Sequence, residues 1–425
     1  MSTSESNPIQ ELNEFINQAK SRGVAQQVDE GESHDGRTVF VNGKELINFG
    51  SCGYMALEFD ERVRQGGIEA IKKYGVEFST SRVFLSNPLY PKLETLLEEI
   101  FQLPTLLAPT TTLAHLAALP ILVGQDDVVL LDQQVHSSIQ MAAKILSAKG
   151  VKIEIVSHSN IWRVERKIKS YKDFKNKIWY LGDGVYSMYG DLAPIEELEN
   201  LLKTHEQFHL YLDDAHGMSW MGDRGCGFVL DKLRHERLFV LTGLAKGFGT
   251  GGGAIICPSI DIKQLIRNCG GPQLFSGPLQ PPILGAAVES AKIHLGKDYP
   301  KLQNELRKRI QFCSQALEGQ PLPLLSSPDS PIRFLGVGST DKAQEIVKLL
   351  IDDGFWLNIA QFPAVAPHHA GLRFMMTRKT RDQDTKEFVE AIKKAVHQIF
   401  GSSEESISQI WKAFSKEYRY SLING

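Results

Sequence analysis

Residues 238–258 read LFVLTGLAKGFGTGGGAIICP: a short apolar run, a lysine at position 246, a glycine-rich turn and a second apolar run. Runs of four to six apolar residues bounded by glycines are typical of strands buried on both faces of a sheet. Lys246 is therefore expected on a tight turn between two buried strands. A buried amine is costly unless it is bonded or neutralised. This makes Lys246 a candidate for a covalent bond to an aldehyde cofactor, with a simple surface lysine as the alternative.

The same turn contains a GxGxxG match at Gly247, Gly249 and Gly252. The dinucleotide fingerprint of that form needs a helix after the glycines and an acidic residue further along. A strand-like run follows here instead, and the GK[ST] ending of a phosphate-binding loop is missing. We therefore favour a lysine site over a nucleotide site.

Apolar runs like those flanking Lys246 recur along the preceding hundred or so residues, and helix-like stretches such as 138–148 and 195–205 lie between them. This alternation predicts an α/β fold with a doubly wound, mostly parallel sheet. The runs expected to form its strands are 128–131, 152–156, 178–181, 209–212, 238–241 and 254–257.

The pattern changes on either side of this region and predicts four parts. They are an N-terminal segment (1–59), a large α/β domain (60–300), a small α+β domain (301–400) and a C-terminal helical extension (401–425). In the extension, apolar residues at three-to-four spacing predict an amphipathic helix docked on the body of the protein. In the small domain, the expected strands are 332–337, 356–360 and 372–376, and the expected helices are 302–317 and 341–353.

Composition sets further bounds on the function. The chain has 425 residues, is 42% hydrophobic and 23% charged, and carries a formal net charge of -3. Nothing in this balance indicates binding to nucleic acid or to an anionic membrane surface. The five cysteines are scattered without a CxxC pair, so we expect no disulfide framework and no metal site. Without a signal-like start or an apolar run of about 18 residues, we expect a cytoplasmic enzyme with no membrane span.

A second segment, LYLDDAHG at 210–217, places Asp213 where an apolar strand ends. Ligands of doubly wound sheets bind at the carboxyl ends of strands. A pyridoxal-phosphate (PLP) enzyme needs a lysine to form a Schiff base and a carboxylate to keep the pyridine nitrogen protonated. Asp213 and Lys246 stand at consecutive strand ends in that order. An Asp that only caps a turn is the alternative.

The phosphate of such a cofactor needs backbone N–H groups at the start of a helix. Thr110, Thr111 and Thr112 precede a helix-like run and suit this role, with an ordinary helix N-cap as the alternative.

With these residues in place, the chain resembles the α-oxoamine synthase family of PLP-dependent enzymes, which have the fold type I of class II aminotransferases. The similarity runs in order from about residue 45 to 395. The segments that carry it are NFGSCGYMAL (48–57), YGVEFSTSR (74–82), LYPKLETLLEEI (89–100), DQQVHSS (132–138), GDGVYSMYGDLAPI (182–195), YLDDAHG (211–217), LAKGFGTGGG (244–253) and GLRFMMT (371–377).

The resemblance implies a role for each matching residue. Lys246 would bind PLP as a Schiff base and move protons, and Asp213 would pair with the pyridinium. Arg373 would bind the carboxylate of an amino acid, with Arg82 as a further substrate-binding residue. The other expected cofactor contacts are His136 stacked on the ring, His216 and Ser187 near its O3′ oxygen, Thr111 and Thr112 on the phosphate, and Ser276 on the phosphate of the neighbouring subunit of a homodimer.

The sequence also departs from the family pattern. Cys52 and Gly53 replace the usual asparagine and acid, and Asp183 replaces a common glutamate. Gly371 stands where the family has the first arginine of R-L-R, so Arg373 is alone. Three further departures lie near the cofactor and substrate segments. Tyr189 replaces an aspartate, Gly243 replaces a frequent threonine three residues before the lysine, and Ala245 replaces a serine, threonine or glycine just before it.

The family's reaction implies that this chain condenses an α-amino acid with an acyl thioester, carried by CoA or a carrier protein, and releases CO2 and a thiol. Two alternatives stay open. One is an aminotransferase or decarboxylase of the same fold. The other is a non-catalytic partner subunit, although such subunits usually lose the lysine that Lys246 provides here.

Overall fold

The structure is a computed structural model, and it describes residues 8–171, 176–401 and 404–418. The chain forms two compact units. Unit 1 combines residues 1–54, 188–191 and 305–425, and unit 2 combines residues 55–187 and 192–304. Most of the expected N-terminal segment (1–59) thus belongs to the same unit as the C-terminal part of the chain, while residues 55–59 belong to unit 2.

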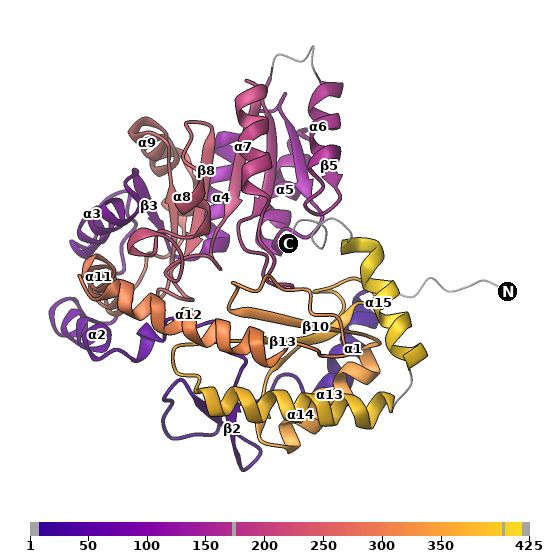
Figure 1. Cartoon of the computed structure of the whole chain (residues 1–425). Helices are drawn as coiled ribbons and strands as arrows, with labels where there is room; N and C mark the ends of the chain where they lie inside the picture. The colour runs from indigo at the N-terminus through magenta and orange to yellow at the C-terminus, as the bar shows by residue number, and fades with distance from the viewer. Residues whose placement is uncertain (1–7, 172–175, 402–403, 419–425) are drawn as a thin grey trace. The chain divides into compact units, whose positions relative to one another are not determined.

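Unit 2 is built on a seven-stranded sheet with the order β3-β9-β8-β7-β6-β4-β5 (Figure 1). The pairs from β5 through β8 are parallel, whereas β9 runs antiparallel to both β8 and β3. The strands are β3 (Thr105–Ala108), β4 (Val128–Asp132), β5 (Lys152–Val156), β6 (Ile178–Asp183), β7 (Phe208–Asp213), β8 (Leu238–Gly243) and β9 (Gly253–Ile256).

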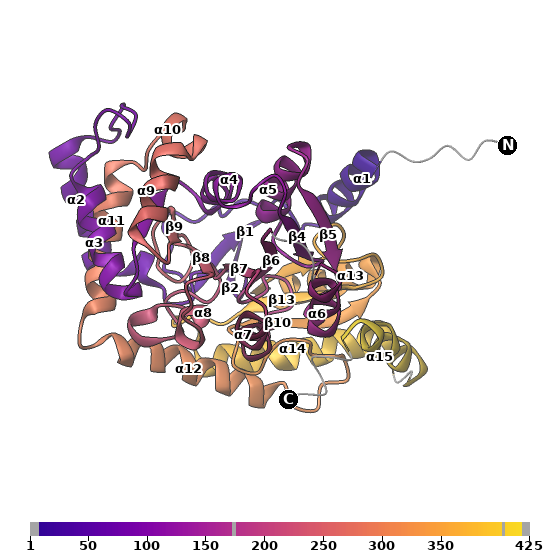
Figure 2. The ribbon, with the colours of Figure 1, turned by 90° about the horizontal axis from the view of Figure 1, so that it is seen from above.

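The inner strands β6 and β8 are buried along their whole length, because helices cover both faces of the sheet. Figure 2 shows α4 (Thr111–Leu122) and α5 (Ser137–Ala148) on one face, with α7 (Ile195–Thr204) and α8 (Phe228–Lys232) on the other. Alanines of α4 and α5 pack against branched and aromatic side chains of the sheet in one core cluster. Small helix residues let α4 approach the strands closely, which brings its N-terminus to the carboxyl ends of β7 and β8.

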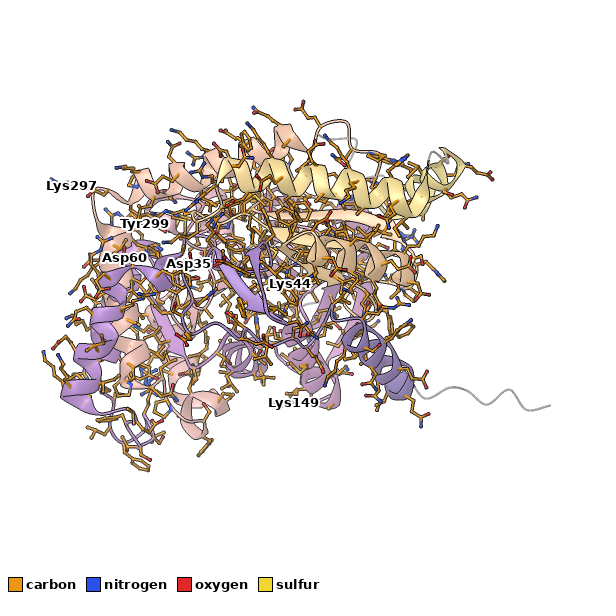
Figure 3. The ribbon with its side chains drawn as sticks, turned by 90° about the horizontal axis from the view of Figure 1, so that it is seen from below. Asp35, Lys44, Asp60, Lys149, Lys297 and Tyr299 are labelled. Carbon is orange, nitrogen blue, oxygen red and sulfur yellow. The ribbon has the colours of Figure 1, made fainter. Side chains whose placement is uncertain are left out.

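The remaining helices of unit 2 flank this core. Asp60 accepts a hydrogen bond from the Arg62 amide and caps α2; Figure 3 labels it. The other elements are η1 (Leu57–Phe59), α2 (Glu61–Tyr74), α3 (Leu89–Phe101), α6 (Ile161–Ser170), η2 (Asp223–Gly225), α9 (Ile260–Cys269), α10 (Gly271–Phe275) and α11 (Pro281–Leu295).

Unit 1 contains two small sheets, ordered β1-β2-β11 and β10-β13-β12. The helix α12 (Tyr299–Ala316) begins in unit 2 and ends in unit 1. The strands are β1 (Thr38–Val41), β2 (Lys44–Asn48), β10 (Ile332–Gly338), β11 (Phe355–Trp356), β12 (Asn358–Ala360) and β13 (Ala370–Met375). The helices are α1 (Pro8–Ser21), α13 (Thr340–Asp352), α14 (Asp382–Phe400) and α15 (Glu404–Tyr418).

The C-terminal helix α15 packs on β10 of unit 1. Ile410 and Phe414 are buried, and a Cβ at Gly336 would lie 2.5 Å from the Phe414 ring. The Trp411 indole N–H donates to the Pro321 carbonyl at 2.8 Å. In the described part of the chain, no helix combines the length and apolar character that a membrane crossing needs.

The predicted fold class is confirmed: a mostly parallel sheet covered by helices on both faces. Two local expectations differ from the structure. Residues 356–360 form two strands in different sheets, because the chain crosses at the buried Leu357 from β2 to β13. The strand at Thr105–Ala108 is not among the expected strands, although all four of its residues are buried.

Candidate functional site

The predicted lysine and aspartate both follow buried strands of unit 2. Asp213 is the last residue of β7, and Lys246 lies in the turn after β8, where the Gly249 amide donates to the Lys246 carbonyl at 2.9 Å. Because β7 and β8 are parallel neighbours, both residues lie at the same edge of the sheet. Their charges interact, since Lys246 is one of the groups that lower the pKa of Asp213.

Asp213 is buried, and each of its two carboxylate oxygens has a hydrogen-bond partner. One carboxylate oxygen accepts from the Ala215 amide at 2.9 Å, and the other lies 2.9 Å from Nε2 of His115. Burial would raise the pKa of Asp213, but the bond to His115, with help from Lys246, outweighs burial and lowers it to about 2. The site therefore holds an ionised carboxylate out of water.

The pKa of the acid on the adjacent strand is shifted in the opposite direction. Asp183 stands directly opposite Asp213 in the β6–β7 register, and one of its oxygens accepts from the His136 amide at 3.2 Å. Burial, and then the charge of Asp213, raise the pKa of Asp183 well above its usual range. Pairs of acids whose surroundings push their pKa values apart are typical of active sites. Here one negative charge is concentrated on Asp213.

His136 precedes α5 and caps it. Its Nδ1 accepts from the Ser138 amide at 3.3 Å and lies 2.7 Å from the Ser138 hydroxyl. Although the residue is partly exposed, desolvation of the ring lowers its pKa, and Asp213 and Lys246 both act on that pKa. The ring is therefore neutral at pH 7 and close to the two charged residues of the site.

The N-terminus of α4 forms a cradle next to this edge of the sheet. Thr110 caps the helix by accepting from the Leu113 amide at 3.1 Å, and Thr111 and Thr112 are the first helical residues. Their N–H groups precede the first intrahelical bond and can bind an anion.

Two glycines let the backbone approach this helix end. A Cβ at Gly253 would lie 2.9 Å from the Thr111 amide nitrogen, and one at Gly243 would lie 3.3 Å from the Thr111 hydroxyl. The space that a side chain at position 243 would use is thus occupied by Thr111. The neighbouring Thr242 does not replace it, since its hydroxyl donates to the Asp214 carbonyl at 3.1 Å inside the core.

The other predicted cofactor residues lie in loops of unit 2. His216 is buried in the turn after β7, where its carbonyl accepts from Trp220 at 2.6 Å. Ser187 is half-buried after β6. Ser276 ends α10, and its hydroxyl donates to the Pro272 carbonyl at 2.5 Å.

Arg373 is buried on β13 of unit 1, and its guanidinium lies 3.7 Å from the Cys52 sulfur. Asn358 is its neighbour in the β12–β13 register. Gly371 cannot be replaced by a larger residue, because a Cβ there would lie 2.4 Å from the Leu335 carbonyl and 2.5 Å from the Phe334 ring. Packing therefore explains why only one arginine is found on this strand.

Arg82, by contrast, is held inside unit 2. Its guanidinium pairs with Glu94 at 3.1 Å, donates to the Leu107 carbonyl at 3.2 Å and lies 3.8 Å over the Tyr90 ring. A substrate-binding role for Arg82 stays a prediction.

A buried polar network supports the turn that carries Lys246. The Ser290 hydroxyl donates to the Phe248 carbonyl at 2.7 Å, and the two nitrogens of His294 lie 2.8 Å from the Ser290 carbonyl and 2.9 Å from the Ser219 hydroxyl. The His294 ring stacks on Phe248 and lies 4.2 Å from the ring of Tyr299, which Figure 3 labels. Sequence reasoning missed this network and His115, because single histidines in apolar helices are usually core residues.

Comparison with known proteins places this geometry in a family. The family model described as "Aminotransferase class I and II" matches residues 44–392. The chain belongs to this family. A curated relative named 8-amino-7-oxononanoate synthase, from Thermoanaerobacter pseudethanolicus, is 27% identical over 91% of this chain and 97% of its own. Another of that name, from Treponema denticola, is 28% identical over 86% of this chain and 91% of its own.

Solved structures show the same fold. Serine palmitoyltransferase of S. paucimobilis, with a bound PLP–myriocin aldimine, has a TM-score of 0.84 at 22% identity and covers 92% of this chain and 99% of its own. The 8-amino-7-oxononanoate synthase of Francisella tularensis has a TM-score of 0.69 at 21% identity, covering 84% and 99%. The predicted α-oxoamine synthase resemblance is confirmed by these relatives.

Proposed function

We propose that this aminotransferase-family chain is a PLP-dependent acyltransferase. It condenses an α-amino acid with an acyl thioester and releases an α-aminoketone, CO2 and a free thiol. The observation that carries the proposal is the pair formed by Lys246 and the buried, ionised Asp213 at one edge of the sheet. The residues present fit PLP: an amine for its aldehyde, a carboxylate for its pyridinium and a helix N-terminus for its phosphate.

In this proposal, PLP supplies an electron sink that stabilises negative charge on the amino acid's α-carbon. Asp213 would accept a hydrogen bond from the pyridine nitrogen and keep it protonated. The neutral His136 would stack on the ring, while His216 and Ser187 would hydrogen-bond near O3′. The amides of Thr111 and Thr112 would hold the phosphate, and the Thr111 hydroxyl, which lies beside Gly243, would supply the donor that position 243 lacks.

The amino acid's carboxylate is bound by Arg373, whose planar guanidinium can hold both oxygens. Lys246 Nζ removes the α-proton. The α-carbon then forms a bond to the thioester carbonyl carbon, and the C–S bond breaks to release the thiol. The original carboxylate leaves as CO2, and a proton returned to the α-carbon completes the aminoketone.

The test is a paired product assay on the purified protein. Amino acids are supplied with acyl thioesters of varied chain length, and CO2 and free thiol are measured together with the absorbance of bound PLP. We expect equimolar CO2 and thiol only when both substrates are present. Lys246→Ala should lose both the cofactor absorbance and turnover, whereas Lys263→Ala, on α9, should retain them.

Other outcomes would assign the chain to a different function. Amino-group transfer without thiol release would indicate an aminotransferase, and CO2 without thiol release would indicate a decarboxylase. A protein that neither binds added PLP nor turns over either substrate would be a non-catalytic subunit. Turnover retained by Lys246→Ala would overturn the proposed role of that lysine.

We also propose that the enzyme is a homodimer in which Ser276 reaches the neighbour's phosphate. An apolar surface supports this assembly. Phe84 and Phe275 are 85% and 87% exposed, and Val83 and Leu85 flank Phe84 with their own exposed side chains. The two segments are joined by the Ser81 hydroxyl, which donates to the Leu274 carbonyl at 2.7 Å. Large exposed apolar patches usually mark interfaces, and Ser276 directly follows Phe275.

A cytoplasmic location is the last part of the proposal. The thiols of all five cysteines are free, and one of them, Cys269, is exposed. Free exposed thiols suit a reducing compartment.

A further inference from the structure

Three buried polar side chains form a chain of hydrogen bonds behind the cofactor site. Tyr211 and Asp213 lie two residues apart on β7, so both point to the same face of the sheet. His115 meets them from α4, with Nδ1 2.9 Å from the Tyr211 hydroxyl and Nε2 2.9 Å from Asp213. None of the three side chains is more than marginally exposed.

The chemistry of the partners fixes the direction of the bond to Asp213. An ionised carboxylate can only accept, so the proton between His115 and Asp213 is carried by His115 Nε2. Burial raises the pKa of Tyr211 well above its usual range, so its side chain remains a phenol. The Tyr211 hydroxyl can donate or accept, so it can bond His115 Nδ1 whether or not that nitrogen carries a proton. Both ring nitrogens are bonded, and the ring cannot rotate without breaking one of the two bonds.

The same contacts decide the charge of Asp213. The carboxylate lies away from water and next to Asp183, and both conditions oppose ionisation. The Ala215 amide and His115 supply the compensating donors. The Ala215 amide is a backbone donor that any residue at that position would provide. The His115 donor is a side chain, so a substitution can remove it.

We propose that His115 is a positioning residue, held by Tyr211, that keeps Asp213 ionised and directs its remaining lone pair at the pyridine nitrogen. The inference rests on the proposed PLP function. His115 touches neither the substrate nor the cofactor in this proposal, and it acts only through Asp213.

The experiment compares PLP binding to the wild type and to variants between pH 5 and 8. His115→Phe fills the space without a donor, whereas His115→Gln keeps an amide N–H that can reach Asp213. We expect His115→Phe to bind PLP about 10- to 100-fold more weakly, the usual range when an orienting partner is lost. The deficit should grow as the pH falls, because burial without His115 moves the titration of Asp213 toward neutral pH.

His115→Gln should recover most of the affinity and the flat pH profile. Tyr211→Phe keeps the donor to Asp213 but removes the restraint on the ring, so we expect a smaller loss. His209→Gln, on the same strand but outside the site, is the matched control and should bind PLP as the wild type does. The melting temperatures of the apoproteins report any general loss of packing.

Three results would overturn the inference: wild-type affinity and pH profile in His115→Phe, an equal deficit in His115→Gln, or a deficit that follows apoprotein stability alone. If His115→Phe fails to fold, PLP binding by the other two variants tests the inference. It then predicts a small loss of affinity in Tyr211→Phe and an affinity close to that of the wild type in His115→Gln. A wild-type protein that does not bind PLP would instead refute the proposed function itself.

Discussion

At the scale of single residues, the surroundings of each acid set its chemistry. Asp213 and Asp183 are neighbours on parallel strands and both are buried, yet of these two only Asp213 is bonded by a histidine side chain, while the histidine at Asp183 donates through its backbone amide. The pKa of Asp213 is therefore lowered and that of Asp183 raised, so the surroundings favour the charge on Asp213. Asp214 follows the second pattern, since burial raises its pKa well above the usual value. All three residues are aspartates, so the residue type alone would not distinguish their pKa values.

Arg373 gives a prediction at this scale. If its guanidinium binds both oxygens of the amino acid, Arg373→Lys keeps the charge but loses the paired geometry. We expect the KM for the amino acid to rise by about 10- to 100-fold, because charge-assisted hydrogen bonds contribute roughly 1.5–3 kcal/mol. PLP affinity should not change. Steady-state kinetics and a PLP titration measure the two effects.

The control for this variant is Arg378→Lys, because Arg378 pairs with Glu305 at 3.0 Å and is not among the predicted substrate residues. Its KM should stay close to that of the wild type. An unchanged KM in Arg373→Lys, or an equal rise in Arg378→Lys, would remove Arg373 from the substrate site.

At the scale of elements, the turn carrying Lys246 depends on α11. His294 on that helix is bonded through both nitrogens and stacks on Phe248, two residues beyond the lysine. Burial lowers the pKa of His294 from 6.5 to about 4. The network therefore needs a neutral histidine, and its stability is linked to pH.

The sign of this linkage gives a prediction. Above pH 6.5, His294 is neutral in both the folded and the unfolded chain, so its titration does not lower the free energy of unfolding. Between pH 6.5 and 4, the unfolded chain binds the proton first, so stability falls as the pH falls, by roughly 3 kcal/mol in total. His294→Gln cannot titrate, so its free energy of unfolding should depend less on pH in this window, although it starts lower.

Urea unfolding at several pH values between 4 and 7 measures this dependence. The matched control is His397→Gln, since His397 lies on the exposed side of α14 and should give the wild-type slope. Equal slopes for the wild type and His294→Gln would show that His294 does not carry the effect.

At the scale of the whole molecule, the exposed phenylalanines argue for a second copy of the chain. We expect Phe84→Glu combined with Phe275→Glu to give monomers in light scattering, because facing carboxylates repel and cannot be solvated in a closed interface. PLP affinity should fall with dimerisation if Ser276 completes the neighbour's phosphate site. Trp162→Glu is the control, because Trp162 is an exposed aromatic residue on a different helix, α6.

A dimer that persists in the double variant with unchanged PLP affinity would contradict this interface. A double variant that is monomeric but binds PLP with full affinity would support the interface and exclude a phosphate contact from Ser276.

The local pattern of the sequence determined the strands around the site. Apolar runs at 178–181 and 238–241 are visible in the sequence because burial on both faces demands apolar residues at every position. The same rule put Asp213 and Lys246 at strand ends, where ligands bind. Family motifs then suggested roles for residues that local patterns cannot interpret. The apolar runs are local signals, and the family motifs are recognised by their order along the chain.

The tertiary structure alone decided which distant residues meet. His115 reaches Asp213 across 98 positions, and nothing in an apolar helix segment indicates that contact. Likewise, the Phe334 ring excludes a side chain at Gly371, and Thr111 occupies the space beside Gly243. Strand order and helix packing fix such contacts, and both depend on the summed burial of the whole core instead of on any short stretch of sequence.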